Sequence, residues 1–135
     1  MTARVLVIDD EEDIRIVLKE VFSRAGFDVD VAANSSAGID KLRKRPADLV
    51  VIDVIMPGMD GVTAAREIRG EFPETRIIVI SGGGNISPKD YEPSAIKTEA
   101  YLASASAAGA DLTLTKPFDR QALIDAARKL TGLED

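Results

Sequence analysis

Five side chains that could support phosphoryl chemistry follow strand-like runs of apolar residues. Two aspartates end the first run, one ends the third, and a hydroxyl and an ammonium follow the fourth and fifth: Asp9, Asp10, Asp53, Ser81 and Lys116. Three carboxylates in one pocket repel one another unless a cation neutralises them. Oxygen ligands without histidine or cysteine suit Mg²⁺, with Mn²⁺ as the second choice. One carboxylate would remain free to act on a phosphoryl group, which the hydroxyl and the ammonium would hold.

Each of these residues also has an ordinary structural interpretation. An aspartate at a strand end is commonly a helix cap or a turn former. A serine before glycines is commonly part of a loop, and Lys-Pro alone carries little information. The combination is more informative, because unrelated caps would rarely place acid, acid, hydroxyl and ammonium after the first, third, fourth and fifth strands.

The composition excludes several other kinds of site. The 135 residues include no cysteine and no histidine, which excludes thiol catalysis, disulfides, thiolate or imidazole metal ligands and phosphohistidine on this chain. With 23 acidic and 17 basic residues the net charge is −6, so the basic footprint of a nucleic-acid-binding protein is absent. The one basic cluster, residues 41–45, ends an expected helix and would oppose its dipole there. No apolar run approaches the roughly 18 residues of a membrane span and no signal peptide is evident, so we expect a cytoplasmic protein.

Short apolar runs alternate with segments of helical period along the chain. The expected strands are 5–8, 27–33, 49–53, 76–81 and 112–115. The first helix is expected from an apolar stripe over 14–22 and the others at 35–44, 62–71, 93–108 and after Asp119. Asn34 and Asp119 are the expected N-caps, and Gly26 is expected to end the first helix.

Continuously aliphatic runs are typical of parallel strands that are covered by helices on both faces. The alternation predicts an α/β fold with a doubly wound five-stranded parallel sheet. We adopt the order 2-1-3-4-5 from flavodoxin-like (βα)5 proteins, with an extended connection between the fourth and fifth strands, residues 82–109. In that order the ends of strands one, three, four and five meet at one rim, where ligands bind. The length predicts a single domain, 1–135, without an output domain.

Over essentially its whole length the chain resembles the receiver domains of bacterial two-component response regulators, in particular the stand-alone chemotaxis-regulator type. The resemblance rests on the pair Asp9-Asp10, on Ser81-Gly82, on Lys-Pro-Phe at 116–118 and, most specifically, on residues 53–61 (DVIMPGMDG). It implies that Asp53 is the phospho-accepting nucleophile. It also implies Mg²⁺ ligation by Asp53, by Asp10 directly and by Asp9 mainly through water.

Further roles follow from the same resemblance. The carbonyl of Ile55 would be a metal ligand, Ser81 would bond a phosphoryl oxygen, and Lys116 would pair with the phosphoryl group. The implied reaction moves a phosphoryl group from a phosphohistidine of a sensor histidine kinase or histidine phosphotransfer protein to Asp53, followed by hydrolysis. The chain would catalyse only its own phosphorylation and dephosphorylation. As a monomer or weak dimer it would signal through protein contacts in a phosphorelay, without nucleic acid or membrane.

Two features depart from the family's pattern. Thr113 stands where the family commonly has Tyr or Phe, so a switch that turns an aromatic ring inward cannot operate. The connection 82–109 is longer than usual. We therefore expect phosphorylation to change the order or position of residues 82–109, and this segment, the fifth strand and the last helix to select the downstream partner. The alternative is a passive insertion.

Three other functions compete with the receiver interpretation. An aspartate-nucleophile phosphatase would carry Asp-x-Asp after the first strand, whereas Asp9 and Asp10 are adjacent. A dinucleotide-binding module would carry Gly-x-Gly-x-x-Gly there, and the two aspartates would repel a pyrophosphate. A receiver-like protein that binds partners without being phosphorylated stays open because of Thr113.

Overall fold

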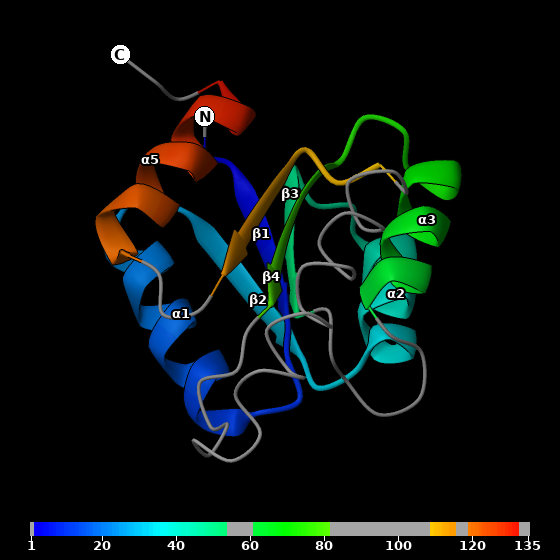
Figure 1. The fold of residues 1–135 in the computed structure, drawn as a ribbon, viewed down its shortest axis with the longest axis horizontal. Coiled ribbons are helices and arrows are strands. Elements are labelled where there is room, and N and C mark those ends of the chain that lie inside the picture. Colours follow the sequence, from blue (N-terminus) through cyan, green and yellow to red (C-terminus); the bar gives the residue numbers. More distant parts are fainter. Residues whose placement is uncertain (1, 54–60, 82–108, 116–118, 133–135) are drawn as a thin grey trace.

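The computed structural model describes residues 2–53, 61–81, 109–115 and 119–132. A parallel sheet of order β2-β1-β3-β4-β5 forms its centre. The strands are β1 Arg4–Ile8, β2 Asp28–Ala32, β3 Leu49–Asp53, β4 Arg76–Ser81 and β5 Leu112–Thr115. Helices α1 (Glu12–Arg24) and α5 (Arg120–Thr131) cover one face, and α2 (Ser35–Lys44) and α3 (Gly61–Glu71) cover the other (Figure 1). The expected doubly wound fold and strand order are confirmed.

Local signals in the sequence account for where the helices begin and end. The Asn34 side chain accepts a hydrogen bond from the Ala37 N–H at 2.8 Å, and Asp119 accepts one from the Gln121 N–H at 2.9 Å. Both predicted N-caps are therefore confirmed. After α1 the backbone of Gly26 has φ 97°, the left-handed conformation that glycine adopts at low cost at a helix end.

The two faces of the sheet build two apolar cores, because successive side chains of a strand point to opposite faces. One core packs Leu6, Ile8 and Ile52 against α2 and α3; the other packs Val5, Val7 and Val51 against α1 and α5.

The second strand, β2, is shorter than the predicted range 27–33. Phe27 precedes it and packs edge-on against Phe22 of α1, with ring centroids 5.6 Å apart at 89°.

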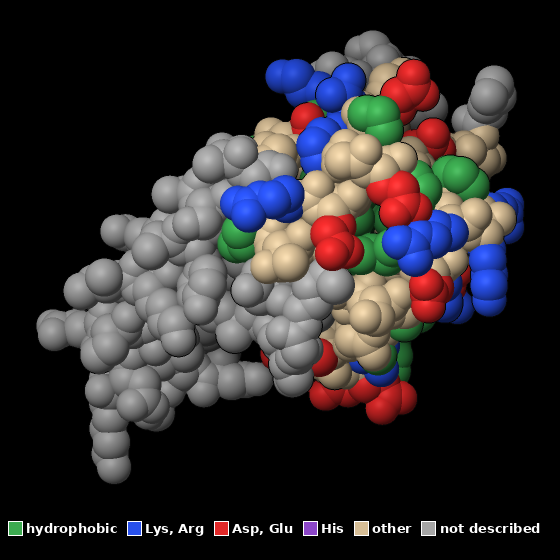
Figure 2. Space-filling view, turned by 90° about the vertical axis from the view of Figure 1, so that its right-hand side faces the viewer, with side chains coloured by type: hydrophobic (Ala, Val, Ile, Leu, Met, Phe, Trp, Pro, Cys, Tyr) green, Lys and Arg blue, Asp and Glu red, His purple; other side chains and the backbone are tan. Residues whose placement is uncertain are grey.

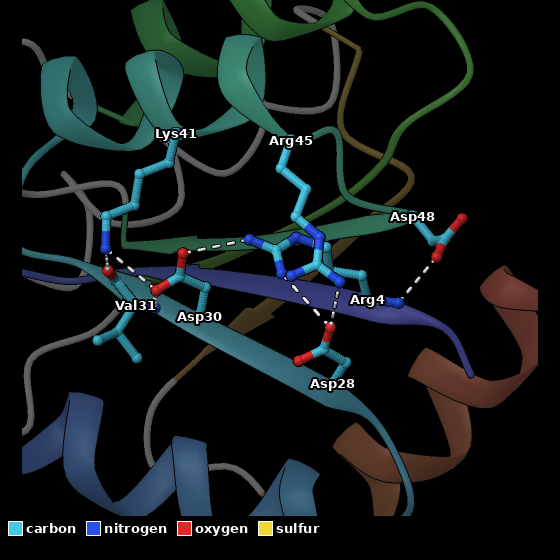
Figure 3. A network of polar contacts seen from close by, with 7 residues as sticks. All are labelled: Arg4, Asp28, Asp30, Val31, Lys41, Arg45 and Asp48. Atoms are coloured by element: carbon cyan, nitrogen blue, oxygen red, sulfur yellow. Dashed lines mark hydrogen bonds and ion pairs between the residues drawn. The ribbon is translucent and has the colours of Figure 1, made fainter.

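The basic cluster 41–45 does more than oppose the dipole of α2. The Lys41 ammonium lies 3.0 Å from Asp30 Oδ1 and 2.6 Å from the Val31 carbonyl oxygen, and Arg45 lies 3.1 Å from Asp28. Lys41 and Arg45 thus tie α2 to the edge strand β2, and Arg4 of β1 contacts the same two aspartates (Figure 3).

Acidic side chains also meet the basic residues on the outer side of α2 and α3. The Arg43 guanidinium makes two hydrogen bonds to Glu71, at 2.7 and 2.9 Å, and this contact lowers the pKa of Glu71. In Figure 2 basic and acidic side chains of the described residues are interspersed over this face. Lys41, Arg43 and Arg45 of the cluster thus form ion pairs with acidic side chains of the fold.

None of the helices formed by the described residues has the length and apolar character needed to span a bilayer. The loop expected at 82–92 and the helix expected at 93–108 lie outside the described residues.

Candidate functional site

Four carboxylates meet at the carboxyl ends of two neighbouring strands. Each offers an oxygen atom, and these four atoms all lie within 4.8 Å of one another; the residues are Asp9, Asp10, Glu11 and Asp53. The first three follow β1 directly, and Asp53 is the last residue of β3. Residues 44 positions apart thus form one acidic rim, a name used below for these four residues.

The register of the sheet brings the rim together. Strands β1 and β3 are parallel, and Ile8 pairs with Ile52, so the next residue on each chain is an aspartate at the same height. On its other side Asp53 pairs with Ile80 of β4. Ser81, the last residue of β4, is therefore the next residue after the partner of Asp53.

Hydrogen bonds fix the turn that carries the β1 carboxylates. The Asp9 N–H donates to the Ala32 carbonyl oxygen at 3.1 Å, and Asp9 Oδ1 accepts from the Glu11 N–H at 2.9 Å. The Asp9 carbonyl oxygen accepts from the Arg15 guanidinium at 2.8 Å. The turn is thus held through three separate groups of Asp9 before any ligand binds.

Burial differs among the four carboxylates. Asp9 and Asp53 are 3% and 7% exposed, Glu11 is half-buried and Asp10 is exposed. Gathering negative charges at a partly desolvated rim is unfavourable unless a cation neutralises them. The donor set is all oxygen, which fits a hard divalent cation such as Mg²⁺. Asp10 is therefore the member of the rim that solvent reaches most freely.

The structure brings together the three aspartates that the sequence singled out. Ser81 ends β4, where it pairs with Thr115 of β5. Lys116 is the next residue after β5 in the sequence, and both it and Ile55 lie outside the described residues.

Sequence reasoning did not single out Glu11. It occupies the N-cap position of α1, but its side chain makes no capping hydrogen bond there. The available signal was the acidic run that starts at Asp9 and continues into the first turn of the helix. Such a run resembles ordinary charge at a helix N-terminus, so it did not mark Glu11 as a member of the rim.

Thr113, which departs from the aromatic residue common in the family that the chain resembles, is half-buried in β5 and pairs with Val79. Its neighbours Leu112 and Leu114 pack on the α1 and α5 side of the sheet. By the alternation of a strand, Thr113 belongs to the opposite face, shared with α2 and α3.

Comparison with known proteins agrees with this arrangement. Residues 5–128 match the family described as response regulator receiver domain. The chain is 31% identical to the chemotaxis protein CheY of Bacillus subtilis over 130 residues, 96% of this chain and 98% of that protein. It is 29% identical to sporulation initiation phosphotransferase F of the same organism over 134 residues, 99% of this chain and 98% of that protein. The crystal structure of the receiver domain of NtrX from Brucella abortus superposes with a TM-score of 0.80 at 28% identity, covering 96% and 99% of the two chains.

Proposed function

Because this chain belongs to the family of response regulator receiver domains, which act in two-component signalling, we propose that it accepts a phosphoryl group on Asp53. The donor is a phosphohistidine of a sensor histidine kinase or of a histidine phosphotransfer protein. The chain has no histidine, so the donor imidazole lies outside these 135 residues.

The observation that carries the proposal is the position of Asp53 in the acidic rim. Its carboxylate lies at the end of a fully buried strand, among three other carboxylates within 4.8 Å. In the proposed step an Asp53 oxygen forms a bond to phosphorus while the bond from phosphorus to the donor imidazole nitrogen breaks, and the imidazole leaves with a proton. Water later hydrolyses the acyl phosphate and restores the carboxylate.

Mg²⁺ is the cofactor that the rim fits best, with Mn²⁺ as a substitute. Asp10 and Asp53 would hold it directly, Asp9 mainly through water, and the Ile55 carbonyl oxygen would add a ligand. When bound, the ion supplies positive charge for the carboxylates and the phosphoryl oxygens. The protein's own contribution is positional, because the hydrogen bonds of Asp9 hold the β1 turn in place.

Ser81 and Lys116 complete the proposed site. The Ser81 hydroxyl would donate to a phosphoryl oxygen, and the Lys116 ammonium would pair with the phosphoryl charge. The sheet order supports this assignment, since Ser81 ends the strand beside Asp53 and Lys116 follows the strand beside Ser81.

Receiver domains are in general signalling modules rather than enzymes for other substrates, and we propose that this one acts through protein contacts as a monomer or weak dimer. The partner surface is expected to run from residues 82–109 over β5 to α5. Residues 82–108 of that surface lie outside the described part of the chain.

Incubation with acetyl phosphate and Mg²⁺, followed by intact-mass analysis, tests the assignment. Wild-type protein should gain one acid-labile phosphoryl group and the Asp53→Asn variant none. Asp40→Asn, which removes an exposed carboxylate of α2, is the matched control and should behave as wild type. Incorporation that persists in Asp53→Asn would contradict the proposal.

A further inference from the structure

One arginine joins α3 to the start of β5, at the end of the sheet opposite the acidic rim. The Arg69 guanidinium donates to the Gly109 carbonyl oxygen from Nε at 3.2 Å and from Nη2 at 3.0 Å. Its Nη2 lies 2.7 Å from Asp111 Oδ2, and its Nη1 donates to the Pro73 carbonyl oxygen at 2.7 Å. A single side chain thus connects the helix, the turn after it and the two residues on either side of Ala110.

Asp111 carries the connection on to β4. Its Oδ2 also accepts from the Ile77 N–H at 2.8 Å, and its own N–H donates to the Ile77 carbonyl oxygen at 2.8 Å. Arg76 reaches Asp111 Oδ1 at 3.5 Å. These contacts come just before the first backbone pair of the two strands, Ile78 with Leu112.

The contact between Arg69 and Gly109 requires glycine. Gly109 has φ +116°, a conformation that side chains rarely adopt, and a β-carbon there would lie 2.9 Å from Arg69 Cγ. The chain entering β5 therefore passes directly against the stem of Arg69. Arg69 and Asp111 side chains are only 26% and 20% exposed, so their ion pair is less screened than one at the open surface.

Strand β5 has little pairing of its own to fix its register, so the contacts of Arg69 and Asp111, called the anchor below, matter to it. It has four residues and lies at the edge of the sheet, and among the strands that the structure describes β4 is its one neighbour. A slip of one residue would turn every side chain of the strand to the other face and shift the chain by about 3.3 Å. The observed register places Thr115 opposite Ser81, at the rim end of the sheet, and Lys116 is the next residue in the sequence.

We propose that Arg69 and Asp111 are positioning residues for phosphorylation: together they hold β5 in its observed register, on which the role proposed for Lys116, the next residue in the sequence, depends. This inference rests on the role proposed above for Lys116. The anchor acts along the length of β5, about 13 Å, from the amino end of the strand to its carboxyl end. Neither residue touches the phosphoryl group.

The test measures the rate constant for phosphorylation at saturating acetyl phosphate and Mg²⁺, together with amide hydrogen exchange over 112–115. Arg69→Ala should lower the rate constant roughly tenfold or more, since small misplacements of reacting groups have effects of that order. Asp111→Asn should act in the same direction, and Arg69→Lys should recover part of the loss. Arg66→Ala removes an exposed arginine from the same helix and should leave the rate unchanged.

Repeating the Arg69→Ala substitution in a Lys116→Ala protein separates an effect on the placement of β5 from a general loss of stability. In a Lys116→Ala protein, Arg69→Ala should have no further effect on the rate constant, although exchange over 112–115 still increases. If Arg69→Ala or Asp111→Asn lowers the rate by the same factor with and without Lys116, or loosens β5 without changing the rate, the positioning role is wrong. If the Lys116→Ala protein is phosphorylated at the wild-type rate, the role proposed for Lys116 is wrong. The positioning role of Arg69 and Asp111, which rests on it, is then wrong as well.

Discussion

Gly38 of α2 lies so close to Ile8 of β1 that a β-carbon at position 38 would stand 2.4 Å from Ile8 Cδ1 and 2.7 Å from Ile8 Cγ1. Ile8 is fully buried and ends the strand that leads into the acidic rim. The glycine that weakens α2 by local propensity thus allows the helix to pack closely against this strand.

We expect Gly38→Ala to destabilise the protein by about 1–2 kcal/mol. Alanine gains up to about 1 kcal/mol in helix propensity, but overpacking a tight core costs about 1–3 kcal/mol. Denaturant unfolding measures the balance. The Ile8→Val background removes the Cδ1 atom and should reduce the penalty. A Gly38→Ala protein as stable as wild type would contradict the close packing.

Neutralising one carboxylate of the rim should stabilise the metal-free protein. Asp53→Asn removes a negative charge from a carboxylate that is 7% exposed and lies within 4.8 Å of three others, a gain of about 1 kcal/mol. Asp10→Asn removes a charge from the exposed side of the rim, where solvent screening makes the gain smaller. Urea melts in chelator report the change. Glu74→Gln, an exposed carboxylate in the turn after α3, is the control and should shift the midpoint little. Lower midpoints in both aspartate variants would argue against a repulsive rim.

Mg²⁺ affinity should fall more for Asp10→Asn than for Asp9→Asn. Asp10 is exposed at the rim, whereas Asp9 is 3% exposed and already engages one oxygen with the Glu11 N–H. An asparagine at position 9 can keep that hydrogen bond through its own oxygen. Isothermal titration calorimetry with MgCl₂ on unphosphorylated protein compares the two variants. The reverse order would show that Asp9 is the stronger ligand.

The contact between Lys41 of α2 and Asp30 of β2 should make the free energy of unfolding depend on pH. Burial alone would raise the pKa of Asp30, but hydrogen bonds from Lys41 and from the Val31 N–H, with the charges of Lys41 and Arg4, hold it below its ordinary 3.8. Folding therefore favours the ionised carboxylate. Its contribution is fully present above the unfolded value and is lost as the pH falls through the lower folded pKa.

Unfolding free energies at pH 2.5–7 check this contribution. The difference between wild type and Asp30→Asn should be constant above about pH 5 and should shrink below about pH 4. Lys41→Met removes the hydrogen bond that lowers the pKa and should reduce the acid-dependent part of the difference. In an Asp30→Asn background, Lys41→Met should have an effect that does not change with pH over this range. A difference that stays constant down to pH 2.5 would contradict the lowered pKa of Asp30.

Within the residues that the structure describes, the sequence by itself determined which segments form strands and helices, and which of them carry acids at their ends. These features depend on residues that are close together in the sequence. They are the period of the apolar residues, the N-caps Asn34 and Asp119, and Gly26 after α1. The motif at 53–61 further identified the family, because it is specific enough to be read without a fold.

Only the tertiary structure decided the register of the strands and the close contacts between the elements. The pairing of Ile8 with Ile52 brings acids from two strands within 4.8 Å, and the Asp9 turn adds Glu11 to them. The contact of Arg69 with Asp111 spans 42 positions, and that of Gly38 with Ile8 joins a helix to a strand. Such contacts depend on register and packing between elements, to which residues far apart in the chain contribute jointly, so no local pattern at any one of them specifies the result.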